Sequence, residues 1–181
     1  MKRALIVVDL QNEYLPTGKL PLTGIEDAAR QARRVMDHAR EAGIAVIHIR
    51  HESSSADAPL FVKNSSGAEI QAQTTPVGDE PVVVKHHINA FRDTDLKQQL
   101  EASGAEELVV VGAMSHMCID AVVRAAVDMG YPVTVLHDAC ATRDLTFNGV
   151  TAPAAHVHAA MMAALEFGYA KVESVDHYLS A

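Results

Sequence analysis

The chain has 181 residues, of which 49% are hydrophobic and 21% are charged, and its formal net charge at pH 7 is −8. This composition is typical of a globular protein and differs from that of a disordered chain. Surfaces that bind nucleic acid or anionic membranes need clustered lysine and arginine, so the acidic balance argues against both kinds of partner. The length fits one domain over residues 1–181.

Two cysteines, Cys118 and Cys140, are too few for a disulfide framework. The N-terminal apolar run reaches an aspartate after five residues, which is too short for the core of a signal peptide. No apolar stretch of the sequence approaches the length of a membrane span. We therefore expect a cytoplasmic protein with reduced thiols.

Short runs of β-branched residues alternate along the chain with longer helical patterns. The first run, 4–10, is almost wholly apolar, as in strands that are covered on both faces. A helix is expected over 23–43, where Thr23 and Glu26 form a capping-box pattern and Gly43 supplies the stop. The further expected strands are 44–50, 82–87, 107–112, 132–138 and 170–175, and the further expected helices are 93–104, 117–130 and 153–168.

This alternation is typical of βαβ units and predicts an α/β fold, in which a parallel sheet of five or six strands lies between two layers of helices. In such sheets ligands bind beyond the carboxyl ends of the strands. Asp9 ends the first expected strand, Lys85 ends the third, and Cys118 follows the fourth where a helix is expected to begin. The three side chains should therefore lie at the same edge of the sheet.

A carboxylate, an ammonium and a thiol at one site suit nucleophilic catalysis. The carboxylate can take the thiol proton, the ammonium stabilises both anions, and a helix N-terminus favours the thiolate. Each residue alone also has an ordinary explanation. A charged residue often marks the first solvated position after a strand, and a lone cysteine is commonly a small buried hydrophobe.

Three segments, ALIVVDLQNEY, VVVKHHINAF and VVVGAMSHMCIDAVVRAAVDMGYPVTVLHDACAT, resemble the isochorismatase-like cysteine hydrolase family. That family also contains nicotinamidases and N-carbamoylsarcosine amidohydrolase, and the resemblance covers nearly the whole chain. It implies the Rossmann-like fold of that family, with Asp9, Lys85 and Cys118 at the positions of the catalytic triad. It also implies a cis peptide bond between Ala113 and Met114, and an oxyanion hole formed by the backbone N–H groups of Met114 and Cys118.

The activity implied by the resemblance is hydrolysis of the C–N bond of a small amide or ureide through a thioester, with no cofactor. Family members that cleave the vinyl ether of isochorismate lack the cysteine, so Cys118 favours C–N hydrolysis. The family's nicotinamidases carry a metal beside the triad, built around an Asp-x-His motif after the second strand. Here that region reads HIRHESS, and His48 and His51 should point to opposite faces of a strand, so we expect no metal site.

Six further residues near the strand ends are expected to contact the substrate: Gln11, Tyr14, Asn89, Phe91, His116 and Met117. Residues 51–80 form a long excursion rich in serine, proline and glycine, and loops of that length in compact domains are commonly functional or disordered. This segment is expected either to line the pocket or to form a solvated loop or subunit contact. Cys140 is expected to be a structural residue in a tight turn.

Two other functions remain open. The chain could be a catalytically silent, oligomeric member of the family, or a redox-sensing thiol protein in which Cys140 resolves an oxidised Cys118. A homo-oligomer is expected, because the helix pattern after Pro153 is rich in alanine and methionine, although packing on the sheet would also explain it. Residues 143–149 resemble a family segment that meets a neighbouring subunit.

Overall fold

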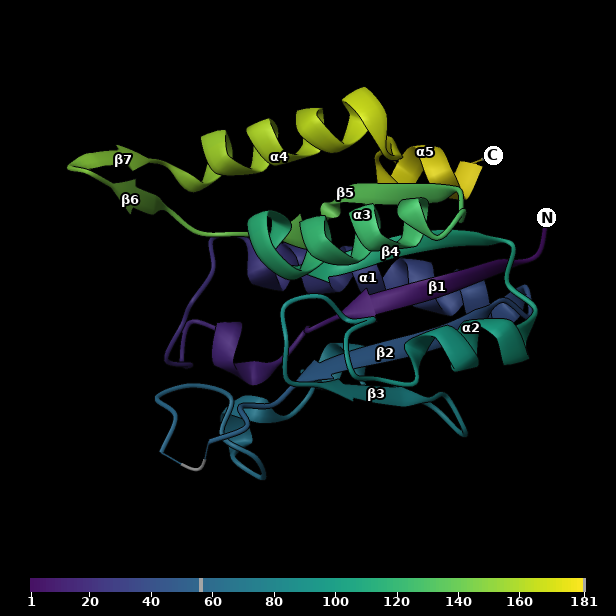
Figure 1. Ribbon diagram of the computed structural model, residues 1–181, viewed down its shortest axis with the longest axis horizontal. Coiled ribbons are helices and arrows are strands. Elements are labelled where there is room, and N and C mark those ends of the chain that lie inside the picture. The colour runs from purple at the N-terminus through teal and green to yellow at the C-terminus, as the bar shows by residue number, and fades with distance from the viewer. Residues whose placement is uncertain (56, 181) are drawn as a thin grey trace.

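The computed structural model describes residues 1–55 and 57–180. Six strands form a parallel sheet in the order β3-β2-β1-β4-β5-β8 (Figure 1). Their bounds are Arg3–Val8 (β1), Ala45–His51 (β2), Val82–Lys85 (β3), Glu107–Ala113 (β4), Val133–Ala141 (β5) and Lys171–Glu173 (β8). The predicted α/β class with a parallel central sheet is confirmed.

Helices cover both faces of the sheet. One face packs against α1 (Ile25–Glu41) and α5 (Val175–Ser180), and the other against α2 (Leu96–Ser103), α3 (Asp120–Asp128) and α4 (Ala154–Gly168) (Figure 1). Each residue of β1 after Arg3 is buried, which explains why that strand is an uninterrupted apolar run. No helix in the described ranges is both long and apolar enough to cross a membrane.

The start of α1 differs from the expected capping box. The helix begins after Gly24, which has a φ of +73°, and no side chain caps it. Thr23 instead forms a β-bridge with Thr142, and its N–H donates to the Thr142 carbonyl oxygen at 2.9 Å. The tertiary contact has replaced the local one.

The region after β5 also differs from expectation. β5 continues to Ala141, so Cys140 lies within a strand opposite Gly112 and not in a tight turn. The segment between the strand expected at 132–138 and the helix expected at 153–168 forms a hairpin. Its strands are β6 (Leu145–Phe147) and β7 (Val150–Ala152), and it projects away from the sheet (Figure 1). Asn148 and Gly149 make its turn with φ values of +48° and +75°.

The strands β2 and β3 follow β1 on one side, and β4 and the later strands lie on its other side. The switch point of the sheet is therefore between β1 and β4, which pair in parallel. Gly112, near the end of β4, has a φ of +127°, and a Cβ atom there would overlap the carbonyl oxygen of Val8. A glycine is therefore required where the two strands approach each other. The carboxyl edge at this switch point is the place where the fold favours a ligand site.

Candidate active site

Asp9, Lys85 and Cys118 meet at the carboxyl edge of the sheet. Asp9 follows β1 with a φ of +50°, and its N–H donates to the carbonyl oxygen of Ile49 on β2. Lys85 ends β3, two strands away from β1, and its side chain reaches across β2. Lys85 Nζ lies 2.8 Å from Asp9 Oδ2 and 3.3 Å from Cys118 Sγ. Both members of the ion pair have 0% exposed side chains.

The ammonium of Lys85 has a third partner in His51, the last residue of β2. His51 is in register with Lys85 in the sheet, and its Nδ1 lies 3.0 Å from Lys85 Nζ. An ammonium carries three donors, and Asp9, His51 and Cys118 lie 2.8, 3.0 and 3.3 Å from the nitrogen of Lys85. Burial is the largest single influence on Lys85 and would lower its pKa. The charge of Asp9, the Cys118 sulfur and the hydrogen bonds to both act together against burial and raise that pKa, so Lys85 stays charged.

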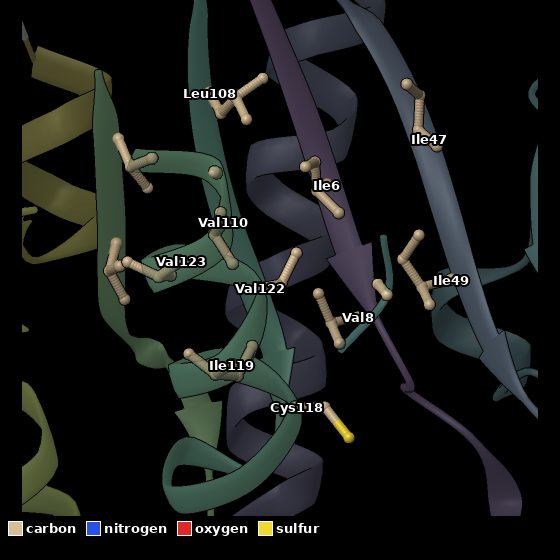
Figure 2. Packing of buried hydrophobic residues seen from close by; sticks show 14 of the residues in the cluster. Ile6, Val8, Ile47, Ile49, Leu108, Val110, Cys118, Ile119, Val122 and Val123 are labelled. Atoms are coloured by element: carbon tan, nitrogen blue, oxygen red, sulfur yellow. The ribbon is translucent and has the colours of Figure 1, made fainter. Parts of the chain in front are cut away.

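Cys118 lies in η4 (Ser115–Ile119), a π-helical turn that precedes α3. Figure 2 shows it beyond the packed side chains of the sheet, past Val8 and Ile49. Burial raises the pKa of its thiol, the Asp9 carboxylate raises it further, and Lys85 only partly opposes them. Cys118 is thus a protonated thiol at neutral pH. A thiolate at a helix start was expected, but α3 begins only at Asp120.

The turn that carries Cys118 is fixed from several sides. The peptide bond between Ala113 and Met114 is cis, and the Met114 carbonyl accepts from the N–H groups of Met117 and Ile119. Ser115 Oγ lies 2.8 Å from Nδ1 of His158 on α4. These contacts hold the sulfur in place relative to Lys85.

A pocket of about 300 Å³ opens above Cys118. Its lining is mainly apolar and comes from the chain after β1, the segment after β2, and the turn before α3. The lining residues are Tyr14, Leu20, His51, Ser53, Ala58, Pro59, Leu60, Phe61, Ile88, Met114 and Cys118. Five of them belong to the long excursion after His51, which therefore forms a wall of the pocket.

A family model described as "Isochorismatase domain" matches residues 3–173. The chain belongs to the isochorismatase family. It is 46% identical over 179 residues to the uncharacterised isochorismatase family protein YddQ of Bacillus subtilis, which covers 99% of both chains. It is 34% identical over 148 residues to a streptothricin hydrolase of Streptomyces noursei, covering 79% of this chain and 51% of that enzyme. A crystal structure assigned to the isochorismatase hydrolases, from Oleispira antarctica, has a TM-score of 0.97 at 50% identity and covers 99% and 97% of the two chains.

Two of the six expected substrate contacts of this isochorismatase-family protein lie after β1. Tyr14 lines the pocket and its ring meets Phe61 edge-on at 5.2 Å between centroids. Gln11 lies outside the pocket lining and is fully buried. Its side-chain amide donates to the carbonyl oxygens of His51 and Ala68, both at 2.8 Å. Gln11 therefore anchors the excursion to the sheet.

The other four expected contacts lie around the pocket and not in its lining. Asn89 Oδ1 accepts from the N–H of Phe91, whose ring packs on the core cluster that includes Cys118. His116 and Met117 line a neighbouring hollow of about 410 Å³, which shares Leu20 and Met114 with the pocket. The two expected contacts that directly precede Cys118 in the sequence therefore face this second hollow and not the pocket.

His51 was missed as a candidate site residue. Residues 51–80 were expected either to line the pocket or to form a solvated loop or subunit contact, and Ser53 and residues 58–61 belong to the pocket lining. The signal for His51 was available, since it ends β2 at the same edge as Asp9 and Lys85. The segment from Ser53 to Phe61 has no periodic pattern that would place it. His48, three residues before His51, is buried, and its Nε2 lies 3.0 Å from Glu80 Oε2. Within the described ranges, no three His, Cys, Asp or Glu side chains are grouped so as to hold a metal ion.

Proposed function

We propose that this isochorismatase-family protein is a cysteine-dependent hydrolase that cleaves the C–N bond of a small amide or ureide through a thioester. The observation that carries the proposal is the single ammonium shared by a carboxylate and a thiol, with Lys85 Nζ 2.8 Å from Asp9 and 3.3 Å from Cys118. Cys118 also lines the pocket, so a bound ligand can reach its sulfur. The streptothricin hydrolase among its relatives is consistent with this chemistry.

The first half of the reaction forms a tetrahedral adduct on Cys118. Asp9 takes the proton of Cys118, and the thiolate attacks the carbonyl carbon of the substrate. The backbone N–H groups of Met114 and Cys118 stabilise the oxyanion, and a donor of this kind typically contributes about 2.7–4 kcal/mol. In the described chain, the Met114 N–H has no backbone acceptor, so it is free to serve a ligand.

The second half releases the products. The protonated Asp9 gives its proton to the leaving nitrogen as the C–N bond breaks, which leaves a thioester on Cys118. Asp9 is then a base again and takes a proton from the attacking water, and the thiol is regenerated when the acid leaves. Lys85 keeps its charge throughout.

A panel of small amides and ureides, assayed for ammonia release, tests this proposal. Cys118→Ala should lower kcat/KM by at least about 1,000-fold, because loss of a nucleophile removes most of the rate enhancement. Cys140→Ala is the matched control and should retain activity, since that thiol lies within β5. Intact-mass spectrometry should detect an acyl adduct on wild-type protein that Cys118→Ala lacks. Activity that survives Cys118→Ala would refute the mechanism, and a panel without turnover would favour a silent protein.

The redox alternative predicts a reactive thiolate and a resolving partner. Burial raises the pKa of both thiols, that of Cys140 to about 12, so neither is activated in the resting protein. Thiol titration before and after peroxide should show no reversible loss of two thiols. A reversible disulfide between Cys118 and Cys140 would instead support the redox function.

We further propose that the chain self-associates through the hairpin and α4. Phe147 in the hairpin is 86% exposed, Val150 is 72% exposed, and Phe167 in α4 is 95% exposed. Phe147 and Val150 share the projecting hairpin, and Phe167 lies near the other end of α4. Large exposed apolar side chains are typical of protein interfaces. Sedimentation equilibrium should show a homo-oligomer that Phe147→Ser with Phe167→Ser dissociates. Met129→Ser, at the end of α3, is the control and should leave the mass unchanged.

A further inference from the structure

We propose that the pocket selects uncharged amides with a small apolar acyl group and rejects substrates that carry a carboxylate; this rests on the proposed function. The pocket's walls, its polar groups and its size support this selectivity. Together they indicate which class of substrate the pocket binds next to Cys118.

The walls of the pocket are apolar on each side of the sulfur. Leu60 and Phe61 come from the excursion after β2, Leu20 from the segment before α1, Ile88 from the chain after β3, and Met114 from the turn before the nucleophile. A carboxylate placed among these side chains would lose its water without gaining a cation that balances its charge. Burial of an unpaired charge costs far more than burial of a neutral group.

The polar groups of the pocket carry no net charge. Burial, followed by the charge of Asp9, raises the pKa of the Tyr14 hydroxyl well above its usual value, so it stays neutral. His51 receives the Lys85 ammonium at Nδ1, so its proton lies on Nε2 and the ring is neutral. Ser53 is neutral as well. Tyr14 and His51 can therefore donate hydrogen bonds to a substrate without attracting an anion.

Lys85 is the cation nearest to the sulfur, and it is not available to a substrate carboxylate. Its ammonium is buried in contact with Asp9, Cys118 and His51, and the charge of Asp9 balances its own. Proton transfer from the thiol to Asp9 leaves the net charge of the group unchanged. No lysine or arginine is among the described residues that line the pocket. The neighbouring hollow is lined by one arginine and one aspartate, Arg143 and Asp144, so its formal charges also sum to zero.

The volume of the pocket limits the acyl group. About 300 Å³ is at the lower end of the range of roughly 300–1,000 Å³ for small-molecule sites. A short aliphatic chain or a single ring fits that volume. We infer that the natural substrate is a compact neutral amide, with hydrogen-bond acceptors that face Tyr14 and His51.

The alkylating pair iodoacetamide and iodoacetate tests the selectivity without any need for turnover. The two reagents have the same size and differ in charge. In both, the sulfur of Cys118 forms a bond to carbon, iodide leaves, and the thiol proton goes to Asp9. In a Cys140→Ala background, intact mass gives the rate of alkylation of Cys118. The ratio of the amide rate to the acid rate should exceed that of N-acetylcysteine by at least about tenfold.

A positive charge placed on the wall should weaken this preference. Ile88 is 40% exposed at the rim, so arginine can be accommodated there without unfolding the protein. Ile88→Arg should lower the ratio at least about threefold relative to Ile88→Gln, which is polar but neutral. A wild-type ratio equal to that of N-acetylcysteine, or an Ile88→Arg ratio equal to that of Ile88→Gln, would overturn the inference.

Turnover separates this inference from the proposed function. Butanamide and succinamate differ only by a carboxylate in place of the terminal methyl group, and butanamide should have the higher kcat/KM by at least about 100-fold. If succinamate were the better substrate and its hydrolysis required Cys118, the selectivity would be wrong and the proposed function would stand. If neither were hydrolysed by the protein, the proposed function would be in question and the alkylation ratio would still decide the selectivity.

Discussion

The buried ion pair between Asp9 and Lys85 can be tested by removing its positive charge with Lys85→Met. The two charged atoms are 2.8 Å apart, and an effective dielectric constant of about 20 gives an attraction of about 6 kcal/mol at that distance. The cost of desolvating both groups opposes this attraction. Loss of one partner from a buried pair leaves the other charge uncompensated and typically destabilises a protein by about 3–5 kcal/mol. Lys85→Met is expected to lower the free energy of unfolding by that amount, a large part of the roughly 5–15 kcal/mol available.

Urea denaturation followed by circular dichroism measures this change, with Asp9→Asn/Lys85→Met as the matched double variant. The double variant has no charge left at the site, so it should be at least about 2 kcal/mol more stable than Lys85→Met. The expected order of stability is wild type, double variant, single variant. If Lys85→Met unfolded within about 1 kcal/mol of wild type, or if the two substitutions were additive, the pair would not be the coupled, buried unit described above.

Three further predictions concern the surroundings of the site. Gly112→Ala should destabilise the chain by more than about 3 kcal/mol in urea denaturation, whereas Gly130→Ala, also at positive φ but with open space around it, should cost about 1 kcal/mol. Burial and the charge of Lys85 lower the pKa of His51 to about 4. As the pH falls below 6.5, the imidazole of His51 is therefore protonated in the unfolded chain before it is protonated in the folded chain. The free energy of unfolding should then decrease as the pH drops towards 4, and it should decrease less in His51→Asn. Equal pH slopes for the two proteins would contradict this. Glu13 accepts from the N–H groups of Phe61 and Lys19, at 2.9 and 3.1 Å. Glu13→Ala should therefore raise KM and speed limited proteolysis within 52–64. An unchanged cleavage rate would show that this contact does not hold the pocket wall in place.

The positions of Asp9, Lys85 and Cys118 were predictable because parallel strands bring their carboxyl ends to one edge. His51 obeys the same rule, but several histidines lie near strand ends and periodicity does not distinguish among them. Its role becomes visible only when its Nδ1 is placed against Lys85 Nζ. The position of Phe61 in the pocket wall could not be derived from the sequence, because its N–H is held by the carboxylate of the buried Glu13, far away along the chain.

Other differences have local physical reasons. The hairpin turn at Asn148 and Gly149 has a strong sequence signal, since both residues tolerate positive φ, and it was overlooked as part of a loop. The extension of β5 to Ala141 was hidden by Asp138, which suggests a strand end. In the structure that carboxylate instead accepts from the N–H of Val175, at the start of α5. The hairpin thus follows local turn propensity, whereas a tertiary contact accompanies the extension of β5.

In the mechanism proposed above, the position of Lys85 between the carboxylate and the thiol would let a buried cysteine react without being a thiolate at rest. Before the reaction the negative charge is on Asp9, 2.8 Å from the ammonium, and after proton transfer it is on Cys118, 3.3 Å from the same ammonium. The net charge of the site is the same in both states, and Lys85 stabilises each without moving. The environment is therefore organised in advance for the charged state that attacks the substrate. A helix dipole alone would favour the thiolate permanently, whereas this arrangement lets the thiolate form when the proton passes to Asp9.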